Sequence, residues 1–396
     1  MVNQTAHRLG TAPNEIRQVF EYGRQQAKLL GEDKVYDFSL GNPSIPAPHE
    51  LNQAIHSIID TESSIRVHGY TSGAGGDLLR EAVAANLTRR FGKPIRPQNV
   101  FITCGAAPAL LAAMIALHTD ESEIITIAPY FTEYKPFTEV SGNKFVLVPA
   151  DMEHFQVNIP ALEAAINEHT QAVILNSPNN PSGAVLTEET LRKVAELLTE
   201  KSALYGHPIY ILADEPYREL VYDGRKVPFI PNIYKDTIVC YSWSKSLSLP
   251  GERIGYVMVA DDVTDSQNVF FAVAGAARMC GHVCAPSLMQ RAVAACIDRM
   301  PDLEAYDVNR KLLYNGLTEI GYKCVRPDGA FYLFVQAPNG DTRAFIEKAT
   351  ARNLLVVDSK PFGVEGYFRL GYCVSKEMIE RALPVFREVY EELCAG

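Results

Sequence analysis

The sequence predicts an α/β protein with a large domain, built on a mostly parallel sheet covered by helices, and a smaller α+β domain. The chain has 396 residues, which is too long for one ordinary hydrophobic core, so two domains are expected. Its middle alternates short β-rich runs with longer helical patterns, whereas its last hundred residues do not. The β-rich runs in the middle are continuously apolar, which is typical of parallel strands buried on both faces.

The alternating elements of the large domain follow one another between residues 100 and 260. In this region each apolar run is followed by a helical pattern or by a turn, so we expect a helix or a turn after each strand. The strands are predicted at 100–103, 124–128, 145–148, 172–176, 209–213, 238–241 and 256–260, and the clearest helices at 106–117 and 187–198.

The rest of the chain predicts the smaller domain. Its elements are a long helix at 303–320, strands at 332–335, 354–357 and 367–370, and a final amphipathic helix at 376–393 with Ser375 as its N-cap. The first 45 or so residues are assigned to it as well, because their strand-like run at 37–40 does not fit the alternating core. We therefore expect a large domain over 49–299 and a small domain formed by 1–48 and 300–396.

Composition and charge exclude several classes of protein. With 47% hydrophobic and 21% charged residues, the chain is an ordinary globular protein. Its net charge of −10 and pI of about 5.5 argue against nucleic acid or an anionic membrane as the main partner. Residues 1–10 have no apolar core typical of a secretory signal, and no apolar run is long enough to span a bilayer.

The eight cysteines are scattered through the chain. In a long chain with no export signal, they predict reduced thiols and a cytoplasmic protein. Cys280, His282 and Cys284 are close in sequence, but they have no clear second ligand pair and apolar flanks. No metal is therefore expected.

The run Ser242-Trp243-Ser244-Lys245, followed by Arg253, is the most informative motif. A lysine amine forms a Schiff base with an aldehyde, and hydroxyls together with an arginine hold a phosphate. The motif therefore predicts a binding site for pyridoxal phosphate (PLP), an aldehyde that carries a phosphate. A solvated surface lysine is the ordinary alternative.

Further candidates follow the predicted strands, at the sheet edge where ligands of α/β proteins bind. Gly105-Ala106-Ala107 comes after the first strand and opens a helix, whose free N–H groups suit a phosphate. Asn180 lies in a rigid turn with two prolines, at 176–183, and its amide has the chemistry to donate to a ring hydroxyl. A plain strand-to-helix turn and a turn-stabilising asparagine are the structural alternatives.

Four more residues suit a flat, charged ligand. Asp214 ends a strongly apolar strand, where a carboxylate is costly unless paired, and a pyridinium N–H would pair it. Tyr217, three residues after Asp214, has a hydroxyl that can bind the ring's phenolic oxygen, and Phe131 has a ring that can stack on it. Arg369, flanked by apolar residues, needs an anion such as a substrate carboxylate. A cap for Asp214, core packing for Phe131 and an ion pair for Arg369 are the alternatives.

The order of these motifs resembles a known family. Asn-Pro-Ser-Gly at 180–183, Asp-x-x-Tyr at 214–217, Ser-x-Ser-Lys at 242–245 and Gly-x-Arg-x-Gly at 251–255 stand in the order found in class I/II aminotransferases, the fold-type I PLP enzymes of the aspartate aminotransferase-like superfamily. The resemblance extends from Leu40-Gly41-Asn42-Pro43 to the C-terminal helix.

The resemblance implies a role for each candidate. Lys245 is then the Schiff-base lysine and proton shuttle, Asp214 the partner of the pyridine nitrogen, and Arg369 the clamp for the substrate α-carboxylate. The other implied roles are the pair that binds the ring's 3′-oxygen (Asn180 and Tyr217), the stacking ring (Phe131), the phosphate cup (Gly105, Ala106, Ala107, Ser242, Ser244 and Arg253), a backbone near the substrate (Gly41 and Asn42) and a tyrosine that reaches the phosphate of the neighbouring subunit (Tyr70).

The implied activity is transfer of the α-amino group of an L-amino acid to a 2-oxo acid. Aspartate or another common amino acid and 2-oxoglutarate are the expected substrates, reacting through the Lys245 Schiff base and a pyridoxamine phosphate intermediate. The resemblance also implies a homodimer with shared active sites and a small domain that closes over substrate. Side-chain specificity stays open: Arg66 and Arg278 are candidates for a cation that binds a distal carboxylate, and Phe331 and Tyr332 for an apolar pocket.

Two other functions compete with this one. A PLP-dependent carbon–sulfur β-lyase needs the same residues, and it would release pyruvate and sulfide from cystathionine or cysteine without an added 2-oxo acid. A PLP-dependent effector module of a transcription regulator would carry a DNA-binding domain ahead of the module. Only about 35 residues precede Asp37, with no basic helix-turn-helix, which argues against such a regulator.

Overall fold

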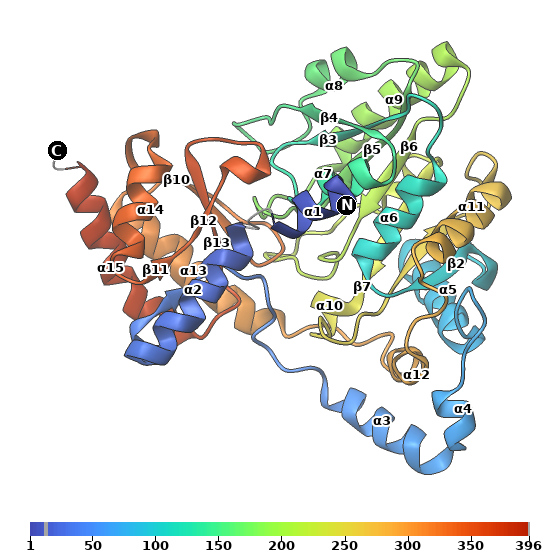
Figure 1. Cartoon of the computed structure of the whole chain (residues 1–396), viewed down its shortest axis with the longest axis horizontal. Coiled ribbons are helices and arrows are strands. Elements are labelled where there is room, and N and C mark those ends of the chain that lie inside the picture. The colour runs from blue at the N-terminus through green and yellow to red at the C-terminus, as the bar shows by residue number, and fades with distance from the viewer. Residues whose placement is uncertain (12–14, 395–396) are drawn as a thin grey trace.

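The computed structural model describes residues 1–11 and 15–394. Its centre is a seven-stranded sheet with the order β2-β8-β7-β6-β5-β3-β4 (Figure 1). Only β8 runs antiparallel to its neighbours, and the other six strands share one direction. The predicted mostly parallel α/β sheet is therefore confirmed. The strands are β2 (Val100–Thr103), β3 (Glu123–Ile127), β4 (Lys144–Val148), β5 (Thr170–Asn176), β6 (Tyr210–Asp214), β7 (Thr237–Ser242) and β8 (Gly255–Val259).

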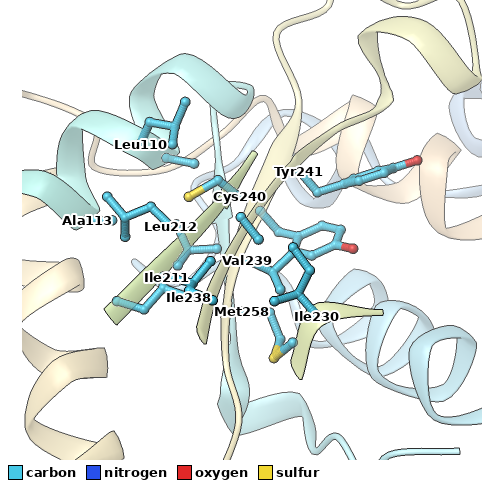
Figure 2. Close-up of a cluster of buried hydrophobic side chains, with 14 of the residues drawn as sticks. Leu110, Ala113, Ile211, Leu212, Ile230, Ile238, Val239, Cys240, Tyr241 and Met258 are labelled. Atoms are coloured by element: carbon cyan, nitrogen blue, oxygen red, sulfur yellow. The ribbon is translucent and has the colours of Figure 1, made fainter. Parts of the chain in front are cut away.

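Helices cover both sides of this sheet because its strands are apolar on both faces. Figure 2 shows Leu110 and Ala113 of helix α6 beside Leu212 of β6 and Cys240 of β7, all of them buried. The helices of this part are α3 (His49–Thr61), α4 (Ser64–His68), α5 (Asp77–Phe91), α6 (Ala106–Ala116), α7 (Tyr134–Val140), α8 (Ile159–Ala165), α9 (Glu188–Tyr205), α10 (Trp243–Ser246), α11 (Ser266–Met279) and α12 (Ser287–Ala295).

A second group of elements lies beside the large sheet (Figure 1). It contains an antiparallel sheet of order β12-β13-β10-β9 and a parallel pair, β1-β11. The elements are β1 (Tyr36–Asp37), β9 (Cys324–Val325), β10 (Tyr332–Gln336), β11 (Leu354–Leu355), β12 (Val357–Asp358), β13 (Tyr367–Gly371), α1 (Gln4–Thr11), α2 (Glu15–Leu30), α13 (Leu303–Ile320), α14 (Thr342–Thr350) and α15 (Lys376–Cys394). Ser375 caps α15, since its Oγ accepts the N–H of Met378 at 3.3 Å.

Several boundaries differ from the sequence prediction for local reasons. Helix α9 continues to Tyr205, where Gly206 takes the left-handed conformation (φ 76°) that ends many helices. The predicted strand at 354–357 is two short strands, which pair in two different sheets. The predicted strand at 37–40 is the two-residue β1.

The second group has its own apolar core. This core joins Phe38 of the N-terminal segment to the strands and helices of the last hundred residues, and it also contains Tyr217, Leu220 and Tyr222 from the middle of the chain. The domain boundaries at 48/49 and 299/300 stay a prediction. Within the described residues, no helix combines the length and the hydropathy that crossing a bilayer requires.

Candidate active site

A cavity of about 290 Å³ opens where the six co-directional strands of the large sheet end. Because these strands share one direction, the segments that follow β2, β5, β6 and β7 meet at one edge of the sheet. Arg369 and Tyr332 reach the cavity from the second group of elements. The lining residues are Ile16, Leu40, Gly41, Ala106, Ala107, Leu110, Phe131, Asn176, Asn180, Asp214, Pro216, Tyr217, Ser242, Ser244, Lys245, Pro250, Arg253, Tyr332 and Arg369.

Lys245 points its amine into this cavity from the short helix α10. Its Nζ donates a hydrogen bond to the backbone oxygen of Gly41 at 2.6 Å. Burial, with a smaller contribution from the positive charges of Arg253 and Arg369, lowers the pKa of Lys245 to about 8. An amine with this pKa is partly neutral near pH 7, as a nucleophile or a general base must be.

The side chains beside Lys245 form an anion-binding cup. The Oγ atoms of Ser242 and Ser244 lie 2.6 Å apart, and Nη1 of Arg253 lies 3.4 Å from Oγ of Ser244. Gly105, with φ 103°, is the N-cap residue directly before helix α6, and a Cβ there would approach Nη2 of Arg253 to 2.8 Å. The N–H groups of Ala106 and Ala107 at the start of α6, the two hydroxyls and the guanidinium therefore suit a phosphate.

Asp214 places a buried carboxylate at the end of β6. Its side chain is 4% exposed, Oδ2 accepts a hydrogen bond from Oη of Tyr134 at 2.5 Å, and Oδ1 has no partner within the described chain. The pKa of Asp214 is raised to about 7, mainly by burial and to a smaller extent by the charge of Glu215, while the Tyr134 bond partly offsets the rise. A cationic N–H donor in the cavity would satisfy Oδ1 and restore the carboxylate.

Arg369 is buried without an acidic partner. It is 2% exposed, Nη1 donates to Oδ1 of Asn180 at 2.9 Å, and Nη2 donates to the backbone oxygen of Ser39 at 2.6 Å. Its Nε has no hydrogen-bond partner, and no carboxylate of the described residues pairs with it. Burial lowers the pKa of Arg369, with no fixed anion to offset the effect. No structural ion pair of Arg369 is present among the described side chains, which favours an anionic ligand.

Aromatic side chains complete the walls. The hydroxyls of Tyr217 and Tyr332 lie 3.0 Å apart, and the guanidinium of Arg369 lies 4.6 Å from the centre of the Tyr332 ring. Phe131 lines the cavity from the segment after β3. Gly41 is required beside them, since a Cβ at this position would collide with the Tyr332 hydroxyl.

Three candidate residues lie away from the cavity. Tyr70 is 95% exposed at the surface. Arg66 is also exposed, with Nε 3.4 Å from Glu62, and Arg278 is exposed near the end of α11. None of the three lines the cavity of its own chain, so their roles stay predictions.

The comparison with known families agrees with this geometry. A family model described as "Aminotransferase class I and II" matches residues 33–386. The chain belongs to the class I and II aminotransferases. Enzymes of this family exchange amino groups between amino acids and 2-oxo acids and use PLP.

Individual relatives support the same family. A solved aminotransferase from Eubacterium rectale is 50% identical, with a TM-score of 0.97 and 99% of each chain covered. The aspartate aminotransferase from Thermus thermophilus, solved with maleate, is 25% identical, with a TM-score of 0.87 over 98% of this chain and 99% of that one. An aromatic-amino-acid aminotransferase from Thermococcus litoralis is 28% identical over 96% of both chains.

These findings decide between the functions expected from the sequence. The protein is a PLP-dependent aminotransferase of the fold-type I architecture, and a carbon–sulfur lyase is not favoured by its relatives. The cavity of this aminotransferase fits PLP in its donor set: an amine, a phosphate cup, a carboxylate oxygen without a partner and an unpaired guanidinium.

Sequence reasoning missed three residues of this aminotransferase site. Tyr134 donates a hydrogen bond to Asp214 although the two residues are 80 positions apart, and no local sequence pattern indicates this contact. The side chain of Asn176 links the end of β6 to the turn that follows β5. Its Nδ2 donates to the backbone oxygen of Asp214 at 2.8 Å, and its Oδ1 accepts the N–H of Asn180 at 2.8 Å. Ile16 of α2 reaches the cavity wall. Only Asn176 had a signal, its place at the end of a predicted strand.

Proposed function

We propose that this aminotransferase binds PLP in the cavity through Lys245 and moves the α-amino group of an L-amino acid to a 2-oxo acid. One observation carries the proposal: the amine of Lys245, the unpartnered Oδ1 of Asp214 and the unpaired guanidinium of Arg369 line the same cavity. These three groups match an aldehyde, a protonated ring nitrogen and a substrate carboxylate.

Bound PLP supplies an aldehyde for amino groups and a ring that accepts electrons when the substrate loses its α-proton. Lys245 is the group that moves this proton. With PLP and substrate bound, its Nζ would remove the proton from the substrate α-carbon and hold it for return. Its pKa of about 8 keeps part of the amine neutral at physiological pH.

The remaining residues bind and orient the substrate and the cofactor ring. Arg369 offers a guanidinium already fixed by Asn180 and Ser39, so little side-chain entropy is lost when it binds an α-carboxylate. Asn180 uses its carbonyl for Arg369, which leaves its NH₂ group for the ring's 3′-oxygen, together with the Tyr217 hydroxyl. Asp214 keeps a negative charge beside the ring nitrogen.

The cofactor phosphate is assigned to the anion-binding cup beside Lys245. The face of the cofactor ring is assigned to Phe131. Gly105, Ala106 and Ala107 contribute the start of helix α6, while Ser242, Ser244 and Arg253 contribute side chains. The Gly41 backbone, which already accepts from Lys245, is placed beside the substrate. These roles follow the family resemblance, and the positions of the side chains in the cavity support them.

Aspartate or another common amino acid is the proposed donor, with a 2-oxo acid such as 2-oxoglutarate as acceptor. Relatives named for aspartate and for aromatic amino acids support this range. Among the described residues that line the cavity, the cations are Lys245, Arg253 and Arg369, and each already has a proposed role. Arg66 and Arg278 stay the candidates for a cation that binds a distal carboxylate, and each would reach the cavity from a second subunit.

We also propose a homodimer with shared active sites, in which Tyr70 reaches the phosphate of the neighbouring subunit. Its 95% exposure supports this role, as do the exposed apolar side chains of Ile65, Met279 and Val283, because such side chains mark association surfaces. The proposed small domain, 1–48 with 300–396, carries Arg369. A reducing compartment such as the cytoplasm is proposed on the eight cysteines, which are all free.

The test is to add single L-amino acids, without any 2-oxo acid, to the PLP-loaded enzyme. An aminotransferase converts its visible absorbance to that of pyridoxamine phosphate and releases one 2-oxo acid per site. Pyruvate and ammonia accumulating beyond one per site, with the visible absorbance returning, would contradict the proposal and favour a lyase. Lys245→Ala is the control, and it should show neither behaviour.

A further inference from the structure

Tyr134 lies beneath the cavity and is not one of its lining residues. It is the first residue of α7, its side chain is 1% exposed, and its ring meets that of Phe131 edge-to-face at 5.6 Å. Burial, followed by the charge of Asp214, raises the pKa of Tyr134 well above its ordinary value. The group is therefore a neutral hydroxyl, and in its 2.5 Å bond with Asp214 it is the donor.

We propose that Tyr134 is a positioning residue, whose hydroxyl holds Oδ2 of Asp214 so that Oδ1 is presented to the ring nitrogen of PLP. This inference rests on the proposed PLP site. Two facts about the carboxylate support it: Oδ2 accepts from Tyr134, and Oδ1 is buried with no partner. A hydrogen bond to one oxygen restricts the rotation of a carboxylate, so it favours one direction for the other oxygen.

The residues around Asp214 indicate that Tyr134 is the group that orients its carboxylate. The charge of Glu215 raises the pKa of Asp214, and Glu215 itself accepts a hydrogen bond from Nε of Arg218 at 2.5 Å. Asn176 holds the backbone oxygen of Asp214, not its side chain. In the described chain, the Tyr134 hydroxyl is thus the one donor to this carboxylate. Without it, Asp214 would be a buried carboxylate with no donor, and its negative charge would be strongly disfavoured.

The test compares the equilibrium dissociation constant of PLP for apoprotein variants at neutral pH. Tyr134→Phe removes only the hydroxyl, and Tyr130→Phe is the matched control. Tyr130 packs against Tyr134, with ring centres 6.5 Å apart, but has no bond to Asp214. Each change is also made in an Asp214→Asn background. Circular dichroism and thermal melting of every apoprotein verify the fold.

Tyr134→Phe should weaken PLP binding roughly ten- to hundredfold, the range for losing a hydrogen bond to a charged group. Tyr130→Phe should change it less than about twofold. In the Asp214→Asn background the effect of Tyr134→Phe should shrink to a few-fold, because the two residues act through one bond. An unchanged dissociation constant for Tyr134→Phe, or the same loss in both backgrounds, would overturn the inference.

These outcomes are distinguishable from a failure of the proposed function, which would appear as wild-type protein that does not bind PLP or binds it without regard to Asp214. If Tyr134→Phe does not fold, the infrared difference spectrum between wild-type and Asp214→Asn apoprotein tests the same bond. A carboxyl signal shifted by a strong hydrogen bond is expected, and the signal of a group with no donor would overturn the inference.

Discussion

Replacing Asp214 with asparagine should stabilise the apoprotein while it weakens PLP binding. Asp214 is 4% exposed, and one of its oxygens has no partner. Without a cofactor, the folded chain therefore disfavours the charged form of this side chain, and its pKa rises from an ordinary 3.8 to about 7. Asparagine has a similar shape and keeps an oxygen for the Tyr134 hydroxyl, but it never ionises.

The sign of the effect follows from proton linkage. The folded state holds the Asp214 proton more tightly than the unfolded state between about pH 4 and pH 7, so stability falls across this interval and is level above it. Each unit of pKa difference corresponds to about 1.36 kcal/mol, which makes roughly 4 kcal/mol the upper bound for this cost near pH 8. We expect Asp214→Asn to gain about 2–4 kcal/mol near pH 8 and little near pH 4.

The assay is urea unfolding of apoprotein at both pH values and at matched protein concentration. Asp236→Asn is the control: Asp236 is also buried, but its Oδ1 accepts the backbone N–H of Thr264 at 2.6 Å, so no gain is expected there. Asp214→Asn protein that is less stable than wild type near both pH values would refute the reasoning. PLP titration of the same samples should show the opposite order, with wild type binding more tightly.

Three further predictions concern other residues of the site. The rate at which apoprotein incorporates PLP should rise about tenfold per pH unit and level off near pH 8, because only the neutral Lys245 amine attacks the aldehyde and its pKa is about 8; a rate still rising near pH 10 would contradict this. Arg369→Gln should raise KM for the amino donor roughly hundredfold while the visible absorbance of bound PLP stays unchanged, and an unaltered KM in steady-state assays would refute the clamp. Mixing Tyr70→Phe with Lys245→Ala subunits should restore one wild-type site per hybrid dimer, measured as regained PLP retention; no regain would count against a shared site.

The large sheet was predictable because its strands are continuously apolar and each is followed by a turn or a helix. The boundaries of the elements were less predictable than the sheet. Helix α9, for example, continues to Tyr205 because Gly206, and not the apolar pattern, ends it. The reversed direction of β8 has no sequence signal, since a buried strand looks alike in either direction. The short pair of β1 with β11 depends on packing between distant segments.

The cavity was predictable where its residues follow strands or stand in family order, as with Lys245, Asp214 and Arg369. The connections between them were not. That Arg369 binds Asn180 and not a carboxylate, and that Tyr134 donates to Asp214, are contacts between segments 189 and 80 positions apart. Such pairs are set by the packed fold, so a single sequence names the side chains but not their partners.

In the proposed mechanism, Lys245 carries the cofactor. The direct measurement is borohydride reduction of the PLP-loaded enzyme, followed by peptide mass spectrometry. We expect phosphopyridoxyl on the peptide that contains Lys245, stoichiometric with subunits, and none on Lys245→Ala protein. Phosphopyridoxyl on another lysine, or a reduced wild-type enzyme with no labelled peptide, would contradict the account.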